Sequence, residues 1–204
     1  VKILLRQHFK EVAMIALILV YGTISVRSTI NLGIRHLLPI LPFIYILVAL
    51  GINNFLEHRG WGTAKKVIVS LLLVWQAVSV IIAFPHFTAY GSEFIGGSKN
   101  LHKYLIDSNI DWGQDLRRLS EYAQKNTIQE LKLLYFGVEQ PDKPLQERVA
   151  EWPKTPKGYY AISTTYLFTD CLAKLVNPCP ITPEFINRKP ITTIGNSIFI
   201  FNFP

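Results

Sequence analysis

Hydrophobic residues concentrate in three long runs before residue 85, and after that point the apolar stretches are short and interrupted. The runs are Val12–Val26, Leu37–Leu56 and Val67–Phe84. The second and third contain 20 and 18 residues and no charged side chain. An α-helix rises about 1.5 Å per residue, so runs of this length match a hydrocarbon core about 30 Å thick. The pattern therefore predicts three membrane-spanning helices.

The first run, Val12–Val26, gives a helix only about 22 Å long, which is short for a complete span. We expect it to pack inside a bundle with other helices. The alternative is that all three runs are buried helices of a large soluble protein, but three in succession favour the membrane. The chain starts at Val1 without an initiator Met, so we expect a C-terminal fragment of a longer protein.

Charge divides the chain at the same point. Residues 1–84 contain eight Lys or Arg and two acidic residues, a net charge of +6, whereas residues 85–204 carry only +1. The cations flank the apolar runs, a membrane-topology signal. The second half has no basic stripe interleaved with aromatic residues, so we predict no nucleic-acid partner.

The same cations predict the orientation in the membrane. Basic residues precede the first run and occupy the loop between the second and third runs, and the positive-inside rule assigns both to the cytoplasm. The 27–36 loop and residues 85–204 then face the extracytoplasmic side. The predicted organisation is a membrane α-helical part, residues 1–84, followed by a small α/β extracytoplasmic domain, residues 85–204.

The loop before the second run contains a candidate anion site. Arg35 and His36 precede Pro39, which we expect to begin the helix, with Pro42 as its fourth residue. A guanidinium beside the free N–H groups of a helix N-terminus favours a lipid phosphate. Alternatively, Arg35 is an interfacial anchor that reaches lipid headgroups, and His36 caps or packs.

The run Asp107–Asp115 is the most polar and chemically varied part of the second half. Asp107, Asn109 and Asp111 alternate as in a calcium loop, but the sixth and twelfth positions of that template would be Trp112 and Arg118 rather than Gly and Glu. A divalent metal is therefore possible but not indicated, and no cofactor is predicted.

Two other interpretations of this nonapeptide remain open. Trp112 can stack on a sugar while Asp107, Asn109, Asp111 and Gln114 bind hydroxyls. Alternatively, Asp111 and Gln114 form a capping box at the start of the next helix and Trp112 packs. Paired carboxylates also suit acid–base chemistry, but the sequence does not fix their separation.

Periodicity in residues 85–204 alternates between helix and strand, which predicts a small α/β layer. We expect Ser98 to cap a helix reaching Ile106, and a helix from Asp111 to Lys125 to bury Leu116, Leu119 and Ala123. The remaining predicted elements are a helix at Leu145–Trp152 and strands at Leu131–Phe136, Gly158–Ser163 and Thr192–Phe203, the last with Ile198 and Ile200 inward and polar partners outward.

The two cysteines, Cys171 and Cys179, flank a loop bounded by prolines. In an extracytoplasmic domain they can form a disulfide or remain two free thiols, and the residues leave both options open. A zinc site is rejected because the pair has no further Cys or His ligands nearby.

Several motifs together resemble bacterial protein-mannosyltransferase-like enzymes of the GT-C fold. They are Asn31–Pro42, Gly96–Asn100, Tyr104–Leu116, Tyr135–Gly137 and Ile194–Phe199, with Ser98 and Leu101 departing from the Pro and Gly expected there. The resemblance implies transfer of a sugar from a polyprenyl-phosphate donor to an extracytoplasmic glycan or protein acceptor. In such enzymes the catalytic Asp lies in the first outward loop, which has no counterpart in this chain.

With this resemblance, Arg35 and His36 become candidates for the donor phosphate. Asp107, Asn109, Asp111, Trp112 and Gln114 become candidates for sugar or acceptor contact, or for docking the outer domain on the membrane helices. The expectation is a multi-pass cell-membrane hexosyltransferase when the protein is whole. The rival hypothesis is a non-catalytic, membrane-anchored module that binds glycan or protein.

Overall fold

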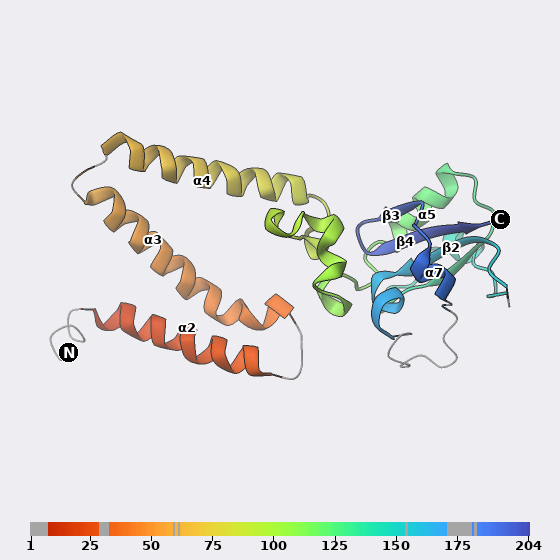
Figure 1. The fold of residues 1–204 in the computed structure, drawn as a ribbon, viewed down its shortest axis with the longest axis horizontal. Helices are drawn as coiled ribbons and strands as arrows, with labels where there is room; N and C mark the ends of the chain where they lie inside the picture. Colours follow the sequence, from red (N-terminus) through yellow and green to blue (C-terminus); the bar gives the residue numbers. More distant parts are fainter. Residues whose placement is uncertain are drawn as a thin grey trace. The chain divides into compact units, whose positions relative to one another are not determined.

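The computed structural model describes residues 8–28, 33–58, 60, 62–153, 155–170, 181 and 183–204. The chain forms two compact units, Val1–Ile82 and Ala83–Pro204 (Figure 1). Each unit is described by itself below.

The first unit consists of long apolar helices. They are α2 (Phe9–Arg27), α3 (Leu41–Glu57) and α4 (Gly62–Ala83), and a 3-10 helix, η1 (Gly33–Ile40), precedes α3. The first helix has 19 residues, about 28 Å, because it begins three residues before the apolar run and includes Lys10 and Glu11. Glu11 lies in the first turn, where a negative charge is favourable.

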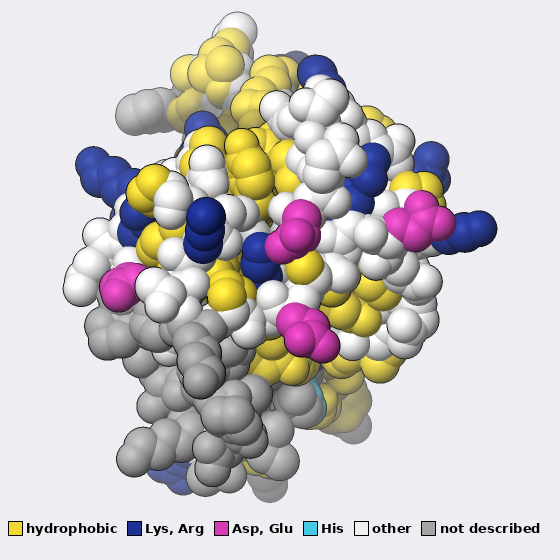
Figure 2. Space-filling model, turned by 90° about the vertical axis from the view of Figure 1, so that its right-hand side faces the viewer, with side chains coloured by type: hydrophobic (Ala, Val, Ile, Leu, Met, Phe, Trp, Pro, Cys, Tyr) yellow, Lys and Arg dark blue, Asp and Glu magenta, His cyan; other side chains and the backbone are white. Residues whose placement is uncertain are grey.

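The three predicted spans are present as helices that are long and apolar enough to cross a membrane. Their apolar side chains are largely exposed, including Leu71 at 63% and Ile82 at 72%. Burial of apolar surface is worth about 25 cal/mol per Å², so helices exposing this much of it are suited to lipid rather than water. By contrast, Figure 2 shows a face of the molecule on which basic and acidic side chains are interspersed among apolar and uncharged groups. The helical unit is therefore suited to membrane association.

The start of the second span differs from the prediction. Pro39 lies inside η1 rather than at the first position of an α-helix, and α3 begins at Leu41 with Pro42 in its first turn. A proline has no N–H to donate, and the first turn of a helix is where that loss is harmless. Arg35 and His36 therefore lie in a 3-10 segment that leads into α3, not in an open loop before it.

The second unit is built on a four-stranded mixed sheet of order β1-β2-β4-β3. The first two strands are parallel, and β4 is antiparallel to both β2 and β3. The strands and helices are β1 (Leu131–Leu134), β2 (Gly158–Ser163), β3 (Thr192–Ile194), β4 (Ile198–Phe203), α5 (Leu116–Lys125), α6 (Lys143–Gln146) and α7 (Pro183–Asn187). Short 3-10 helices at Phe87–Ala89, Glu93–Ile95, Ser98–Lys103 (η4) and Asp107–Asn109 precede them, and a π-helix at Tyr166–Asp170 follows β2. The small α/β domain expected from periodicity is present.

Both faces of this sheet are covered. On one face, Leu116, Leu119 and Ala123 of α5 pack against Ala161, Ile198 and Ile200, so the buried face predicted for this helix is confirmed. On the other face, Phe185 of α7 packs against aromatic residues of β2 and β4, including Tyr160 and Phe201. The structure thus has helices on opposite sides of the central strands (Figure 1).

The predictions for the last strand were partly wrong. The stretch Thr192–Phe203 is a hairpin of two strands, because Gly195 and Asn196 adopt positive φ and turn the chain. The polar partners expected to face outward on β4 are not found either, because five of its six residues are buried. A strand at the centre of a sheet covered on both faces is apolar throughout rather than alternating.

Two predicted helices are shorter than expected. The helix placed at Leu145–Trp152 is only the four-residue α6, capped by the side chain of Asp142. In place of the α-helix predicted from Ser98 to Ile106, the chain forms the 3-10 helix η4, which ends at Lys103, and Gly97 occupies the capping position predicted for Ser98. The hydroxyl of Ser98 is engaged elsewhere, since its Oγ accepts a hydrogen bond from the Gly91 N–H at 3.0 Å.

Candidate functional site at the carboxyl ends of the parallel strands

The nonapeptide Asp107–Asp115 lies at the carboxyl edge of the two parallel strands. Gly137, three residues after β1, has φ of +131°, and a β carbon there would stand 2.1 Å from the Trp112 carbonyl oxygen. Ser163, the last residue of β2, lies close enough to Asp111 to affect its pKa. In open α/β sheets, this edge is where ligands commonly bind.

Two polar side chains of the nonapeptide fold the loop itself. Asp111 Oδ1 accepts a hydrogen bond from the Gly113 N–H at 3.1 Å. Gln114 Oε1 accepts from the Trp112 N–H at 2.7 Å, and Gln114 Nε2 donates to the Ile110 carbonyl at 2.8 Å. The predicted capping box is therefore wrong. The next helix, α5, begins at Leu116, and these two side chains satisfy the backbone of the turn before it.

Asp115 is the anchor of the site. Its side chain is 1% exposed, its Oδ1 accepts a charge-assisted hydrogen bond from Arg118, and its Oδ2 accepts one from Ser197 Oγ at 2.6 Å. Ser197 is 82 residues further along the chain, at the turn between β3 and β4. A buried carboxylate needs partners of this kind to offset its lost hydration. The pair Asp115–Ser197 thus ties the start of α5 to the β3–β4 turn.

His86 lies beside this anchor. Its Nδ1 is 3.9 Å from Asp115 Oδ1, which is too far for a hydrogen bond. That nitrogen is buried and has no hydrogen-bond partner among the residues that the structure describes.

Asp111 is a buried carboxyl group with a raised pKa. Burial is the largest cause and raises its pKa to about 6, with a smaller upward contribution from the neighbouring Asp115 charge, and nearby hydrogen-bond donors only partly oppose the shift. One of these is Ser163, although Asp111 Oδ2 and Ser163 Oγ both lack a partner with hydrogen-bond geometry in the described part of the chain. The hydroxyl therefore acts on the carboxyl group as a nearby dipole.

Asp111 and Asp115 have different hydrogen-bond partners, but both side chains are buried. Asp111 is 0% and Asp115 1% exposed, so neither can contact a substrate in this arrangement. Groups of three or more His, Cys, Asp or Glu suited to a metal are absent from the described residues. The arrangement is suited to holding the loop and the β3–β4 turn together, with a protonation step near pH 6 at Asp111.

Among the described side chains of the nonapeptide, Trp112 is the one most open to solvent. It is 40% exposed, and its Nε1 donates to the Ser108 carbonyl at 2.9 Å, which fixes the ring. The ring lies 6.1 Å from that of Phe136, which in turn lies 6.4 Å from Tyr166. Phe136 follows β1 and Tyr166 follows β2, so the three rings form an aromatic surface along the carboxyl edge of the strands.

The other predicted site residues are distributed as follows. Asn109 is half-buried, and its Nδ2 donates to the Ile106 carbonyl at 3.1 Å, whereas the side chain of Asp107 lies outside the described residues. Arg35 and His36 are exposed and belong to the first unit. Cys171 and Cys179 both lie outside the described residues.

The sequence interpretation missed the residues around the two buried carboxylates: His86, Arg118 and Ser197 beside Asp115, and Ser163 beside Asp111. Only Ser197 carried a signal, since it stands in the stretch Ile194–Phe199 that contributed to the family resemblance. No spacing rule pairs it with Asp115, because the contact depends on how the sheet is wound.

Comparisons with models of known protein families, with curated proteins and with solved structures found no match to this chain.

Proposed function

We propose that this chain is the C-terminal part of an integral-membrane glycosyltransferase that moves a sugar from a polyprenyl-phosphate donor to an extracytoplasmic glycan or protein acceptor. The observation that carries the proposal is the position of Arg35 and His36, exposed on the 3-10 helix that runs directly into the apolar helix α3. The motif resemblance described above points to the same class of enzyme.

The donor phosphate is the natural ligand of that position. A residue at the end of a membrane-spanning helix lies at the depth of lipid headgroups, where a prenyl-linked phosphate also lies. The guanidinium of Arg35 can bind phosphate oxygens through two parallel hydrogen bonds, and His36 can add a donor. Cationic groups here would stabilise the lipid phosphate as it leaves the sugar. In this proposal the catalytic base belongs to a preceding part of the protein.

The acceptor side of the proposal rests on Trp112. Its exposed ring, with Phe136 beside it and Tyr166 next to Phe136, offers an apolar surface of the kind that sugar rings stack on. Asp107, Asn109, Asp111 and Gln114 then act as loop residues that present Trp112, consistent with the inward hydrogen bonds of Asn109, Asp111 and Gln114.

The test is binding of a polyprenyl-phosphate sugar by the intact protein in detergent micelles. We expect Arg35→Ala to weaken binding about tenfold or more and Arg35→Lys to weaken it less, because lysine keeps the charge but not the planar fork. Lys66→Ala is the matched control, since Lys66 is an exposed cation of the same unit at the start of α4. Unchanged donor binding in Arg35→Ala would exclude the phosphate role.

A second candidate function is a non-catalytic, membrane-anchored module that binds glycan or protein. It is favoured by the burial of Asp111 and Asp115, which leaves neither of these two carboxylates accessible to a substrate. The two candidates differ in the requirement for Arg35. Loss of Trp112 would weaken acceptor binding in both, whereas loss of Arg35 would affect only the transferase.

A further inference from the structure

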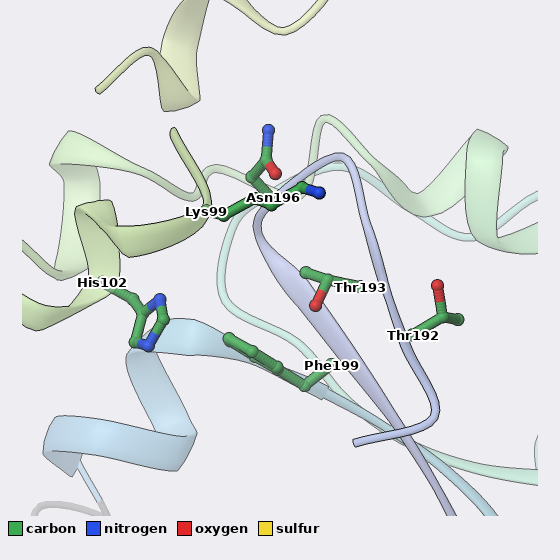
Figure 3. A pocket seen from close by; sticks show the side chains of 6 residues that line it. All are labelled: Lys99, His102, Thr192, Thr193, Asn196 and Phe199. Atoms are coloured by element: carbon green, nitrogen blue, oxygen red, sulfur yellow. The ribbon is translucent and has the colours of Figure 1, made fainter. Parts of the chain in front are cut away.

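A polar cavity of about 300 Å³ opens in the second unit, apart from the buried carboxylates (Figure 3). Lys99 and His102 line it from η4, and the opposite side comes from the β3–β4 hairpin. The hairpin residues are Thr192, Thr193, Asn196 and Phe199. Two motifs that are distant in the sequence, Gly96–Asn100 and Ile194–Phe199, therefore contribute to one cavity.

The hairpin side of the cavity is held in place by the anchor described above. Ser197 donates to the buried Asp115, and Gly195 lies against the same carboxylate. Between them, Asn196 adopts a positive φ of 66°, a conformation that asparagine tolerates better than most residues. Asn196 and Lys99 lie together at one side of the cavity, with Thr193 and His102 further along it (Figure 3).

The rings of His102 and Phe199 form an aromatic wall on one side of the cavity. The His102 ring stacks on Phe168 at 5.1 Å and meets the edge of Phe199 at 5.3 Å. Burial, followed by the neighbouring charge of Lys103, lowers the pKa of His102 below its usual value. The imidazole is therefore neutral at pH 7 and has one donor and one acceptor nitrogen.

The chemistry of the lining selects the ligand. Two hydroxyls and a carboxamide can each donate and accept hydrogen bonds, which is what a ring with several hydroxyl groups requires. The neutral imidazole of His102 adds an acceptor, because its N–H is engaged by the backbone of Lys99. Among the residues that the structure describes, the lining contains one cation, Lys99, and no acidic residue, so a negative charge on the ligand is favoured. The volume is at the lower end of small-molecule pockets and suits a single sugar unit.

We propose that this cavity binds a glycosyl phosphate, with the sugar hydroxyls on Thr193, Asn196 and His102 and the phosphate on Lys99. The ligand is either a soluble sugar phosphate or the sugar phosphate headgroup of a lipid. The site requires neither the transfer reaction nor Arg35, so it stands independently of the function proposed above.

The experiment is titration calorimetry of the full chain in detergent micelles with glucose 1-phosphate, glucose and inorganic phosphate. We expect glucose 1-phosphate to bind at least tenfold more tightly than either glucose or inorganic phosphate. A glucose phosphate ester of a short prenyl alcohol separates the two sources, because tighter binding of the ester identifies the lipid headgroup and equal binding identifies the soluble ligand. Equal affinity for inorganic phosphate, or no binding of glucose 1-phosphate, overturns the proposal.

Two variants distinguish the sugar contacts from the phosphate contact. Lys99→Ala should weaken glucose 1-phosphate binding about tenfold and leave glucose binding unchanged, because it removes one charge-assisted hydrogen bond. Thr193→Val, which keeps the side-chain shape, should weaken both ligands. Lys125→Ala, at an exposed lysine at the end of α5, is the charge-matched control and should change neither. If Lys99→Ala and Thr193→Val both bind as the parent does, with unchanged near-UV circular dichroism, the cavity is not the site.

Discussion

Gly195 lies directly on the buried carboxylate of Asp115: a β carbon at Gly195 would stand 1.9 Å from Asp115 Cγ. The backbone at Gly195 also has a positive φ of 59°. Both observations require glycine here, one because of space and the other because of conformation. The contact joins the β3–β4 turn to the residue that immediately precedes α5.

The first prediction is that Gly195→Ala strongly destabilises the second unit. The added methyl group must displace Asp115 from Arg118 and Ser197, so we expect the free energy of unfolding to fall by about 3 kcal/mol or more. Denaturant unfolding in micelles, followed by near-UV circular dichroism, measures the loss. Gly97→Ala is the control: its φ of 79° and ψ of −175° also favour glycine, but nothing lies within 4 Å of the added methyl group, so only the conformational cost of about 1–3 kcal/mol applies. Equal losses in the two variants would mean that the Gly195–Asp115 contact carries no energy of its own.

A second prediction concerns the hydrogen bond from Ser197. Ser197→Ala leaves one oxygen of a buried, charged carboxylate with a partner missing, which we expect to cost about 1–3 kcal/mol of unfolding free energy. Ser92→Ala provides the comparison, because Ser92 Oγ makes only a 3.4 Å contact at an exposed cap. The same unfolding experiment applies, and a Ser197→Ala loss no larger than that of Ser92→Ala would contradict the anchor.

A third prediction follows from Asp111, whose pKa is raised to about 6 by burial and by Asp115. At pH values between the ordinary carboxyl pKa and about 6, Asp111 is protonated in the folded chain but ionised in the unfolded chain. The contribution of Asp111 to stability is therefore favourable at low pH and falls as the pH rises through this window, by on the order of 2–3 kcal/mol.

Asp111→Asn removes this titration while keeping an acceptor for the Gly113 N–H. We expect the variant to be increasingly stable relative to the parent as the pH rises from about 4 to about 7. Unfolding curves of the two proteins at several pH values measure the difference. A difference that is constant across this range would show that Asp111 keeps an ordinary pKa.

The sequence predicted the elements of this protein better than their ends and contacts. The three apolar runs and the apolar face of α5 were found because helical periodicity is a local property. The start of α5 was missed because Asp111 and Gln114 satisfy the turn rather than the helix, and a capping-box pattern looks the same in both cases.

The remaining errors have a common origin in long-range packing. The sequence predicts one continuous strand across the hairpin turn at Gly195 and Asn196, because the residues on both sides of the turn are β-forming. That turn depends on Asp115, which is remote in sequence, and so do the positions of Asn196 and Thr193 at the cavity. A pattern read along one segment contains no information about a partner that the fold brings from elsewhere.

A fourth prediction tests whether the exposed apolar residues of α4 face lipid or water. Leu72, near the middle of α4, is 56% exposed, and Val138 in the second unit is 85% exposed. If α4 crosses a bilayer, Leu72→Arg adds about 2.5–3.5 kcal/mol to the free energy of insertion, whereas Val138→Arg changes stability by no more than about 0.5 kcal/mol because its side chain stays in water. The fraction of chain retained in membranes after alkaline extraction measures this contrast. Equal retention of both variants at the parent level would mean that the surroundings of Leu72 are as polar as those of Val138, and α4 would not be a span.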